Sequence, residues 1–171
     1  MERRDPEQAA DEVTTMSQFL DYHRATVLMK IEGLTQEQLG LRLPTSELTL
    51  AGLVKHLAYV EDSWFQEDML GRPLPEPWLS APFAEDRDWE LHSAPDDTPE
   101  ELVALYQAAC ERSRAVVRDV GDLSTLSVAK SRHNGEPFSL RWIVLHMIEE
   151  TARHNGHADI LRESIDGVTG E

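Results

Sequence analysis

Four segments with helical hydrophobic periodicity constrain this chain more than any other feature of its sequence. Apolar residues recur along each segment at spacings of three, four or seven, a pattern typical of helices that bury one face. The segments span residues 11–32, 49–70, 98–121 and 139–167. Residues that start or stop helices flank them, such as Thr98 with Pro99 and Glu101 before the third and Gly167 after the fourth. The sequence therefore predicts one all-α domain, residues 1–171, built as an antiparallel four-helix bundle.

Two irregular connections separate the predicted helices. Residues 71–97, between the second and third helices, form a Pro-rich crossover of a kind that does not sustain a helix or a central strand. Its aromatic residues Trp78, Phe83 and Trp89 could pack over an end of the bundle as a functional lid, or dock a linker for stability, and the sequence leaves both open. Residues 128–137 contain an Asn-Gly turn pair and predict a short hairpin-like loop before the last helix.

The charge of the chain limits its partners. The 32 acidic residues outnumber the 16 basic ones, which gives a formal net charge of −16. This negative field would repel phosphate backbones and anionic head groups, so we expect neither nucleic acid nor a membrane surface as partner. No stretch approaches the roughly 18 uninterrupted apolar residues of a membrane span, and the polar first residues do not resemble a secretory signal. We therefore expect a cytoplasmic protein.

The cysteine content narrows the possible chemistry. Cys110 is the only cysteine, which excludes an internal disulfide framework and a multi-cysteine metal site. Any metal must then be held by histidine and carboxylate side chains. The position of Cys110 in the middle of the third predicted helix favours an inert core thiol over a nucleophile.

The fourth segment places two polar side chains on its apolar stripe. Glu150 and His154 continue the row begun by Ile143 and Met147. Residues four apart on a helix have Cβ atoms about 5 to 6 Å apart on the same face, so a carboxylate and an imidazole there can bind one cation. An ionised carboxylate in the core needs a cation, a hydrogen bond or a proton as compensation. The stripe therefore predicts a metal site, with hydrogen-bonded core residues as the alternative.

A third ligand would have to come from another helix. His56 is the best candidate, because it follows Leu53 by three residues and precedes Val60 by four, on the interior side of the second helix. Three protein ligands with open positions resemble catalytic zinc sites more than closed structural ones. Zinc is the metal we expect, although two histidines and one carboxylate also suit nickel, iron or manganese.

His146 complicates the assignment of ligands. It lies four residues before Glu150, so it could replace a ligand, orient Glu150, or take part in catalysis. His23, on the inner stripe of the first helix, is a second candidate catalytic residue, and His157 is a further candidate for substrate contact. Glu149 points about 100° away from Glu150, which predicts an exposed position.

Two more histidines, His92 and His133, fall in the irregular connections. A histidine in a loop is most often a solvated surface group. We therefore expect both to be exposed and without a role in the site.

Four sequence blocks resemble those of a known family. They read FLDYHRATVLMKIEGLTQEQL, LAGLVKHLAYVEDSWF, PEELVALYQAACERSRAVV and PFSLRWIVLHMIEETARHNGHADILRESIDG. They are similar to segments of the DinB superfamily, specifically its DUF664 branch. The resemblance implies a four-helix bundle with a metal held by one histidine on the second helix, here His56, and a pair spaced by four on the last. The first of that pair is Glu150 here, a Glu-for-His variation that resembles the mycothiol-dependent maleylpyruvate isomerases, which are zinc proteins.

The resemblance also implies an activity. Related proteins use a metal to hold a small thiol, such as mycothiol, as the thiolate that attacks an electrophile, so we expect a thiol and a small electrophilic substrate as partners, and a homodimer. A metal-dependent hydrolase is the alternative, with His146, His23 or Glu61 as the general base. A non-catalytic metal- or ligand-binding bundle is a third possibility.

Overall fold

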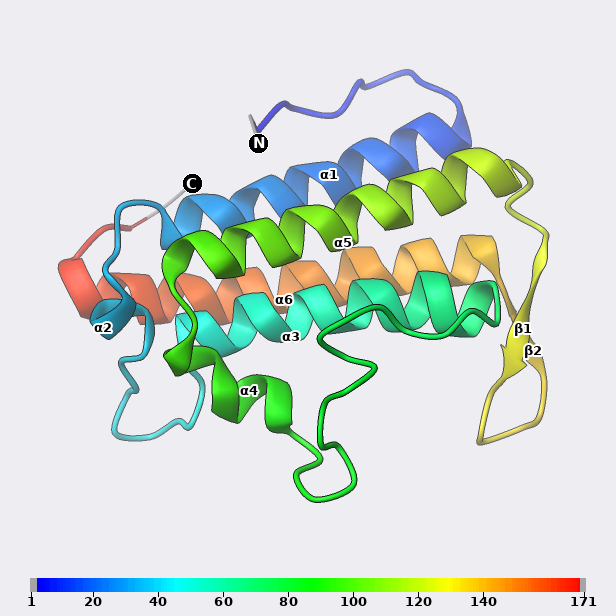
Figure 1. Ribbon diagram of the computed structural model, residues 1–171. Helices are drawn as coiled ribbons and strands as arrows, with labels where there is room; N and C mark the ends of the chain where they lie inside the picture. Colours follow the sequence, from blue (N-terminus) through cyan, green and yellow to red (C-terminus); the bar gives the residue numbers. More distant parts are fainter. Residues whose placement is uncertain (1–2, 170–171) are drawn as a thin grey trace.

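Four long helices form the body of the protein, for which a computed structural model describes residues 3–169. They are α1 (Glu12–Ile31), α3 (Leu50–Asp62), α5 (Pro99–Val120) and α6 (Leu140–Asp166). Figure 1 shows α1 and α6 running in one direction and α3 and α5 in the other. The closest packing is between α1 and α6 and between α3 and α5. The prediction of a mostly helical chain is confirmed.

The start and stop residues of the sequence fix the ends of these helices. Thr98 and Glu101 form the capping box expected before α5, because each side chain accepts a hydrogen bond from the backbone N–H of the other. The hydroxyl of Ser139 caps α6 by accepting from the N–H of Trp142. Gly167 ends α6 in the left-handed conformation, with φ of 77°. The bounds of α5 and α6 therefore lie within a residue or two of the predicted ones.

The second predicted helix changes its geometry before it ends. The α-helix α3 stops at Asp62, and residues Ser63–Met69 continue as a π-helix, η1. The prediction of an α-helix through residue 70 is wrong for these two turns. The wider π turn alters which residues face inward. As a result Phe65 is fully buried, whereas Trp64, expected on the inner stripe, is only half-buried.

The Pro-rich crossover contains helix, contrary to expectation. It holds a short α-helix, α4 (Trp89–Ser93), followed by a 3-10 turn, η2 (Ala94–Asp96). The reason is that residues 83–94 carry no proline and are free to wind. The segment packs along α3 rather than over an end of the bundle (Figure 1). Trp78 anchors it, since its side chain is buried and its Nε1–H donates to Oδ2 of Asp62 at 2.9 Å.

The remaining elements are small. A four-residue helix, α2 (Gln36–Leu39), follows α1. Strands β1 (Leu126–Lys130) and β2 (Pro137–Ser139) form an antiparallel hairpin, as the Asn-Gly turn pair predicts. Among the described residues, no helix combines the length and apolarity needed to cross a membrane.

Candidate metal centre

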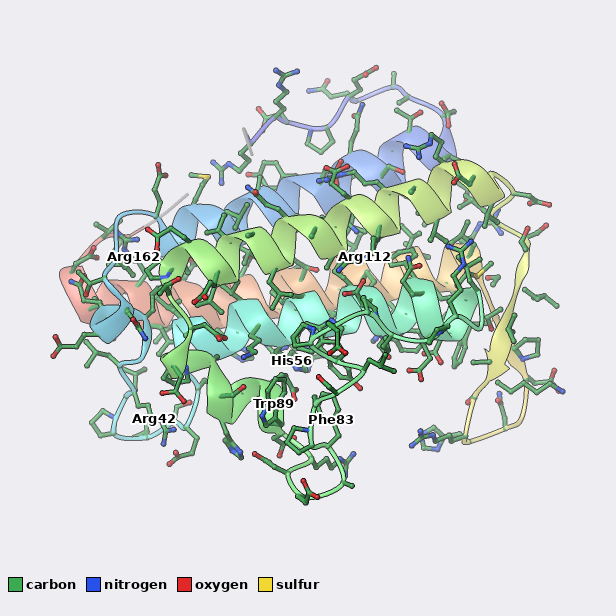
Figure 2. The ribbon with its side chains drawn as sticks, in the orientation of Figure 1. Arg42, His56, Phe83, Trp89, Arg112 and Arg162 are labelled. Atoms are coloured by element: carbon green, nitrogen blue, oxygen red, sulfur yellow. The ribbon has the colours of Figure 1, made fainter. Side chains whose placement is uncertain are left out.

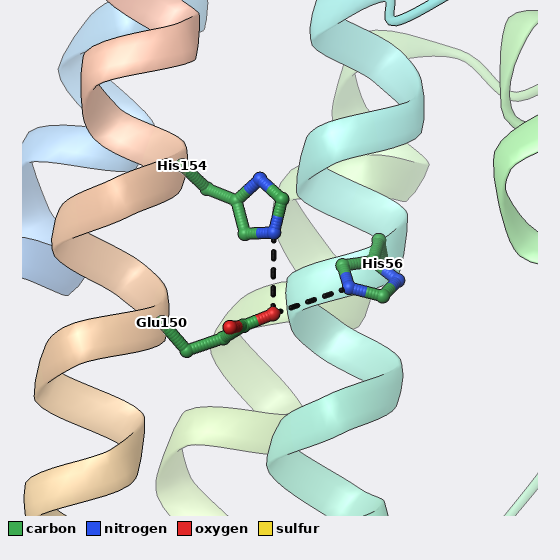
Figure 3. A group of neighbouring side chains, drawn as sticks. All are labelled: His56, Glu150 and His154. Carbon is green, nitrogen blue, oxygen red and sulfur yellow. Dashed lines mark hydrogen bonds and ion pairs between the residues drawn. The ribbon is translucent and has the colours of Figure 1, made fainter.

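Three side chains from two helices converge between α3 and α6 (Figure 3). Nε2 of His154 lies 3.2 Å from Oε1 of Glu150, and Nε2 of His56 lies 3.5 Å from the same oxygen. The rings of His56 and His154 meet at 68°, with their centroids 5.2 Å apart. One nitrogen or oxygen from each residue lies within 4.8 Å of the other two. The three residues singled out in the sequence as metal ligands are therefore brought together.

The local structure explains the convergence. Glu150 and His154 are one helical turn apart on α6, so their side chains stand over the same patch of surface. His56 comes from α3, which packs against α6. The side chains of His56, Glu150 and His154 are 22%, 20% and 13% exposed, respectively. The cluster is thus mostly buried but keeps some contact with solvent.

The donor set fits a divalent metal. A tetrahedral zinc ion holds nitrogen and oxygen ligands at about 2.0 to 2.2 Å, which places those ligands roughly 3.3 to 3.5 Å apart. The separations of 3.2 and 3.5 Å from Glu150 Oε1 to the two imidazole nitrogens are close to this value. Three ligands would leave a position open for a substrate atom.

A fourth residue, Glu90 of α4, adjoins the cluster and was missed from the sequence. Its Oε1 lies 3.0 Å from Nδ1 of His56, on the side of the ring that faces away from Glu150. Figure 2 shows His56 on the side of α3 that faces the segment bearing Phe83 and Trp89. In the sequence, Glu90 is marked only by its place directly after the aromatic Trp89, which is a weak indication of a functional residue.

The two carboxylates control the charge of the cluster. Burial lowers the pKa of His56, but hydrogen bonds and the charges of Glu150 and Glu90 outweigh it and raise this pKa to about 9. The pKa of Glu150 lies well below its usual range, because it accepts hydrogen bonds from His154 and His56. In the protein without metal, the ionised carboxylate of Glu150 therefore lies between two imidazoles that donate protons to it. A metal cation could take the place of those protons.

His157 extends the cluster along α6. Its Nδ1 lies 3.3 Å from Nδ1 of His154, and the two rings meet edge to face with centroids 5.3 Å apart. One of the two nitrogens must donate and the other accept. With Nδ1 of His154 occupied by this contact, its Nε2 remains directed at Glu150.

His146 contacts tryptophan rings and Glu149, and is not one of the three clustered residues. Its ring stacks on Trp142 with an interplanar angle of 17° and meets Trp64 edge to face. Its nearest carboxylate contact is Glu149, at 3.9 Å, rather than Glu150. Glu149 is exposed, as predicted, and forms an ion pair with Arg153.

Two other residues considered from the sequence, His23 and Glu61, are not among the three residues of the cluster. His23 is half-buried on α1, where its ring packs against Tyr22 and its carbonyl accepts from Asn155. Glu61, a candidate base, is fully buried and paired with Arg24, which leaves it unsuited to that role.

His92 and His133 are both exposed, as expected. The placement of His92 in a loop is wrong, however, because this residue lies on α4 and pairs with Asp86. Neither histidine is among the three residues of the cluster.

Comparison with protein families gives a match. The family model described as mycothiol S-transferase matches residues 15–167. This range includes α3, α6 and all three residues of the cluster. No curated protein matches the chain.

Proposed function

Because the chain belongs to the mycothiol S-transferase family, we propose that it transfers a small thiol of the mycothiol type to an electrophile at a metal site formed by His56, Glu150 and His154. In the reaction the thiol loses its proton, and a sulfur lone pair forms the new bond to the electrophilic carbon. In a substitution this carbon expels a leaving group with its electron pair, and the leaving group takes up the proton. In an addition to a double bond the electron pair moves to the neighbouring atom, and that atom takes up the proton. The electrophile is a small molecule that can enter the sheltered cluster between α3 and α6.

One observation carries this proposal. Nitrogen and oxygen atoms of His56, Glu150 and His154 lie within 4.8 Å of one another in a partly exposed position. A free thiol has a pKa around 8.5, so it is mostly protonated and a weak nucleophile at neutral pH. A divalent metal held at this cluster would supply the positive charge that stabilises the thiolate.

The protein's own residues have distinct parts in this arrangement. Glu150 contributes one negative charge, which leaves a divalent site with net positive charge for a thiolate. The imidazoles of His56 and His154 would bind the metal as neutral ligands through the lone pair of Nε2, since their Nδ1 atoms contact Glu90 and His157. Zinc is the metal we expect, because it prefers four ligands and commonly binds histidine and glutamate.

The hydrolase alternative lacks comparable support. It needs a general base close to the open position of the metal. Of the three candidate bases, Glu61 is engaged by Arg24, His146 packs among tryptophan rings, and the ring of His23 packs against Tyr22. Thiol transfer depends less on such a base, because a thiol, with a pKa of about 8.5, loses its proton far more readily than water does.

Metal analysis of purified variants tests the site. We expect His56→Ala, Glu150→Gln and His154→Ala each to reduce bound zinc to a small fraction of the wild-type content. Glu149→Gln is the matched control, since it makes the same chemical change one residue away at an exposed position. Wild-type metal content in all three site variants would overturn the proposed ligands.

A cobalt titration tests the function. Cobalt-substituted protein should develop an intense near-ultraviolet thiolate-to-metal absorption band when mycothiol is added, and His154→Ala protein should not. Turnover of an ester or amide without such a band would instead support a hydrolase. Bound cobalt with neither a thiol band nor turnover would point to a binding protein and contradict the proposal.

A further inference from the structure

We propose that Glu90 is a positioning residue, which orients the imidazole of His56 and strengthens it as a metal ligand. This inference rests on the metal site proposed above. It assigns to the crossover between α3 and α5 a part in building that site. The hydrogen bond, the burial of the carboxylate and the way α4 is held against α3 each support it.

The contact determines which nitrogen of His56 is free. Oε1 of Glu90 lies 3.0 Å from Nδ1 of His56. An ionised carboxylate only accepts hydrogen bonds, so this contact requires a proton on Nδ1. Without metal, Nε2 is the nitrogen that faces Oε1 of Glu150. When a metal takes the place of the proton on Nε2, the neutral imidazole keeps its proton on Nδ1 and offers the lone pair of Nε2. A carboxylate behind a metal-bound histidine fixes the tautomer and raises the basicity of the ligand.

The buried carboxylate of Glu90 needs a positive charge beside it. Its side chain keeps 5% of its exposure, although α4 belongs to a surface segment. Among the described residues, Oε2 of Glu90 has no hydrogen-bond partner and is buried. Burying a carboxylate with one oxygen unpaired is unfavourable unless a nearby positive charge compensates it. A metal beyond the His56 ring, together with the ring itself, would supply that charge.

The contact is held in place by the packing of the crossover on α3. Nζ of Lys55 lies 4.6 Å from the centre of the Trp89 ring and 2.6 Å from Oδ2 of Asp97. On the same helix, Gly52 faces Leu91, since a Cβ at Gly52 would lie in van der Waals contact with the Leu91 carbonyl oxygen, at 3.4 Å. These contacts lie on both sides of Glu90 in the sequence. They fix α4 so that its carboxylate meets the turn of α3 that carries His56.

Two substitutions of Glu90 test the proposal against a matched control. Glu90→Gln keeps the shape of the side chain and one accepting oxygen but removes its charge, whereas Glu90→Ala removes the contact. Glu85→Gln makes the same change at an exposed position of the same segment. Zinc affinity is measured by competition with a chromophoric chelator. We expect a loss of about 10- to 100-fold for Glu90→Ala, a smaller loss for Glu90→Gln, and none for Glu85→Gln.

Spectroscopy separates positioning from a merely structural role. Nitrogen NMR of the zinc-loaded protein should show His56 protonated at Nδ1, and this signal should broaden or change tautomer in Glu90→Ala. The visible spectrum of the cobalt-substituted protein should change in Glu90→Ala while the helical circular dichroism stays the same.

The outcomes also separate this inference from the proposed function. Wild-type zinc affinity and an unchanged His56 signal in both Glu90 variants, with metal lost in His56→Ala, would overturn only the role of Glu90. Metal retained in His56→Ala would overturn the site itself and this inference with it. If Glu90→Ala does not fold, the isosteric Glu90→Gln variant still decides the question through its affinity.

Discussion

Arg24 of α1 and Glu61 of α3 form a bidentate ion pair in the interior of the helical body. The Nε and Nη2 atoms of Arg24 donate to the two carboxylate oxygens at 2.7 and 2.6 Å, and neither side chain keeps more than 3% of its exposure. Removing one partner of a buried pair leaves an uncompensated charge, which costs about 3 to 5 kcal/mol. We therefore expect Glu61→Gln to lower the free energy of unfolding by about 3 kcal/mol or more, as measured by denaturation in urea.

An exposed ion pair offers the control for this measurement. Arg42 and Glu47 are joined at 2.6 Å, but their side chains keep 48% and 90% of their exposure. Exposed pairs contribute at most about 1 kcal/mol, so Glu47→Gln should change the free energy of unfolding by less than that. A loss in Glu61→Gln no greater than the loss in Glu47→Gln would contradict the importance of the buried pair.

Cys110 should be unreactive in the folded protein. Burial raises the pKa of its thiol well above the ordinary range, and the nearby charge of Glu61 raises it further. The thiolate is the reactive form, so iodoacetamide should modify the folded protein very slowly from pH 7 to pH 9. In denaturant the rate should rise with pH through about 8.5, the pKa of a free thiol. Rapid modification of folded protein at pH 7 would show that Cys110 is accessible.

Because the pKa of Cys110 is raised on folding, the free energy of unfolding should fall as the pH rises. Above about pH 8.5 the thiol ionises in the unfolded chain but keeps its proton in the folded one. The folded state then binds more protons, so the contribution of Cys110 to stability falls as pH rises. The free energy of unfolding should decline more steeply between pH 8 and pH 10 for the wild type than for Cys110→Ala. Equal slopes for the two proteins would mean that burial does not raise the pKa of the Cys110 thiol.

The sequence predicted the parts of the metal cluster that depend on helical periodicity. Glu150 and His154 are one turn apart on one helix, so their proximity follows from local geometry. His56 could be assigned because it faces the interior side of its helix. Glu90 could not, because its approach to His56 depends on how a non-periodic crossover folds back along α3. The spacing of residues within one segment carries no information on such a tertiary path.

The same distinction applies to the fold. The ends of α5 and α6 were predictable, because capping residues such as Thr98 and Ser139 act within one turn. The π-helix after Asp62 was not, and it displaced Trp64 from the core position that regular spacing assigned to it. The buried Glu61 was also unforeseen, since its compensating charge comes from another helix, through Arg24.

Trp78 should anchor the crossover to α3. Its Nε1–H donates to Asp62, which also accepts two hydrogen bonds from Arg112. Trp78→Phe keeps most of the buried ring but removes this donor to a charged acceptor, which is worth about 1.5 to 3 kcal/mol. We expect a loss of stability in that range and faster proteolysis within residues 71–97. Leu79→Ala, at a neighbouring position that is 64% exposed, should change neither. Unchanged proteolysis in Trp78→Phe would show that other contacts hold the crossover.

Gly71 should be intolerant of any side chain, for two separable reasons. It has φ of 64°, which disfavours other residues, and a Cβ at this position would lie 2.9 Å from Cγ1 of Val128 on β1. Gly33 shares the first feature, with φ of 75°, but a Cβ there would meet nothing within 4 Å. Gly33→Ala should therefore cost about 1 kcal/mol from backbone strain alone. Gly71→Ala should cost at least about 1 kcal/mol more, because the branched Val128 side chain has little freedom to turn away.

A double substitution isolates the steric part of this cost. Val128 is 67% exposed, so Val128→Ala alone should change the free energy of unfolding little. In the Gly71→Ala background the same change removes the clashing methyl groups. It should therefore recover the part of the stability loss by which Gly71→Ala exceeds Gly33→Ala, measured as a coupling energy in a double-mutant cycle. Additive effects of the two substitutions would mean that the hairpin is not held against the end of η1 by this contact.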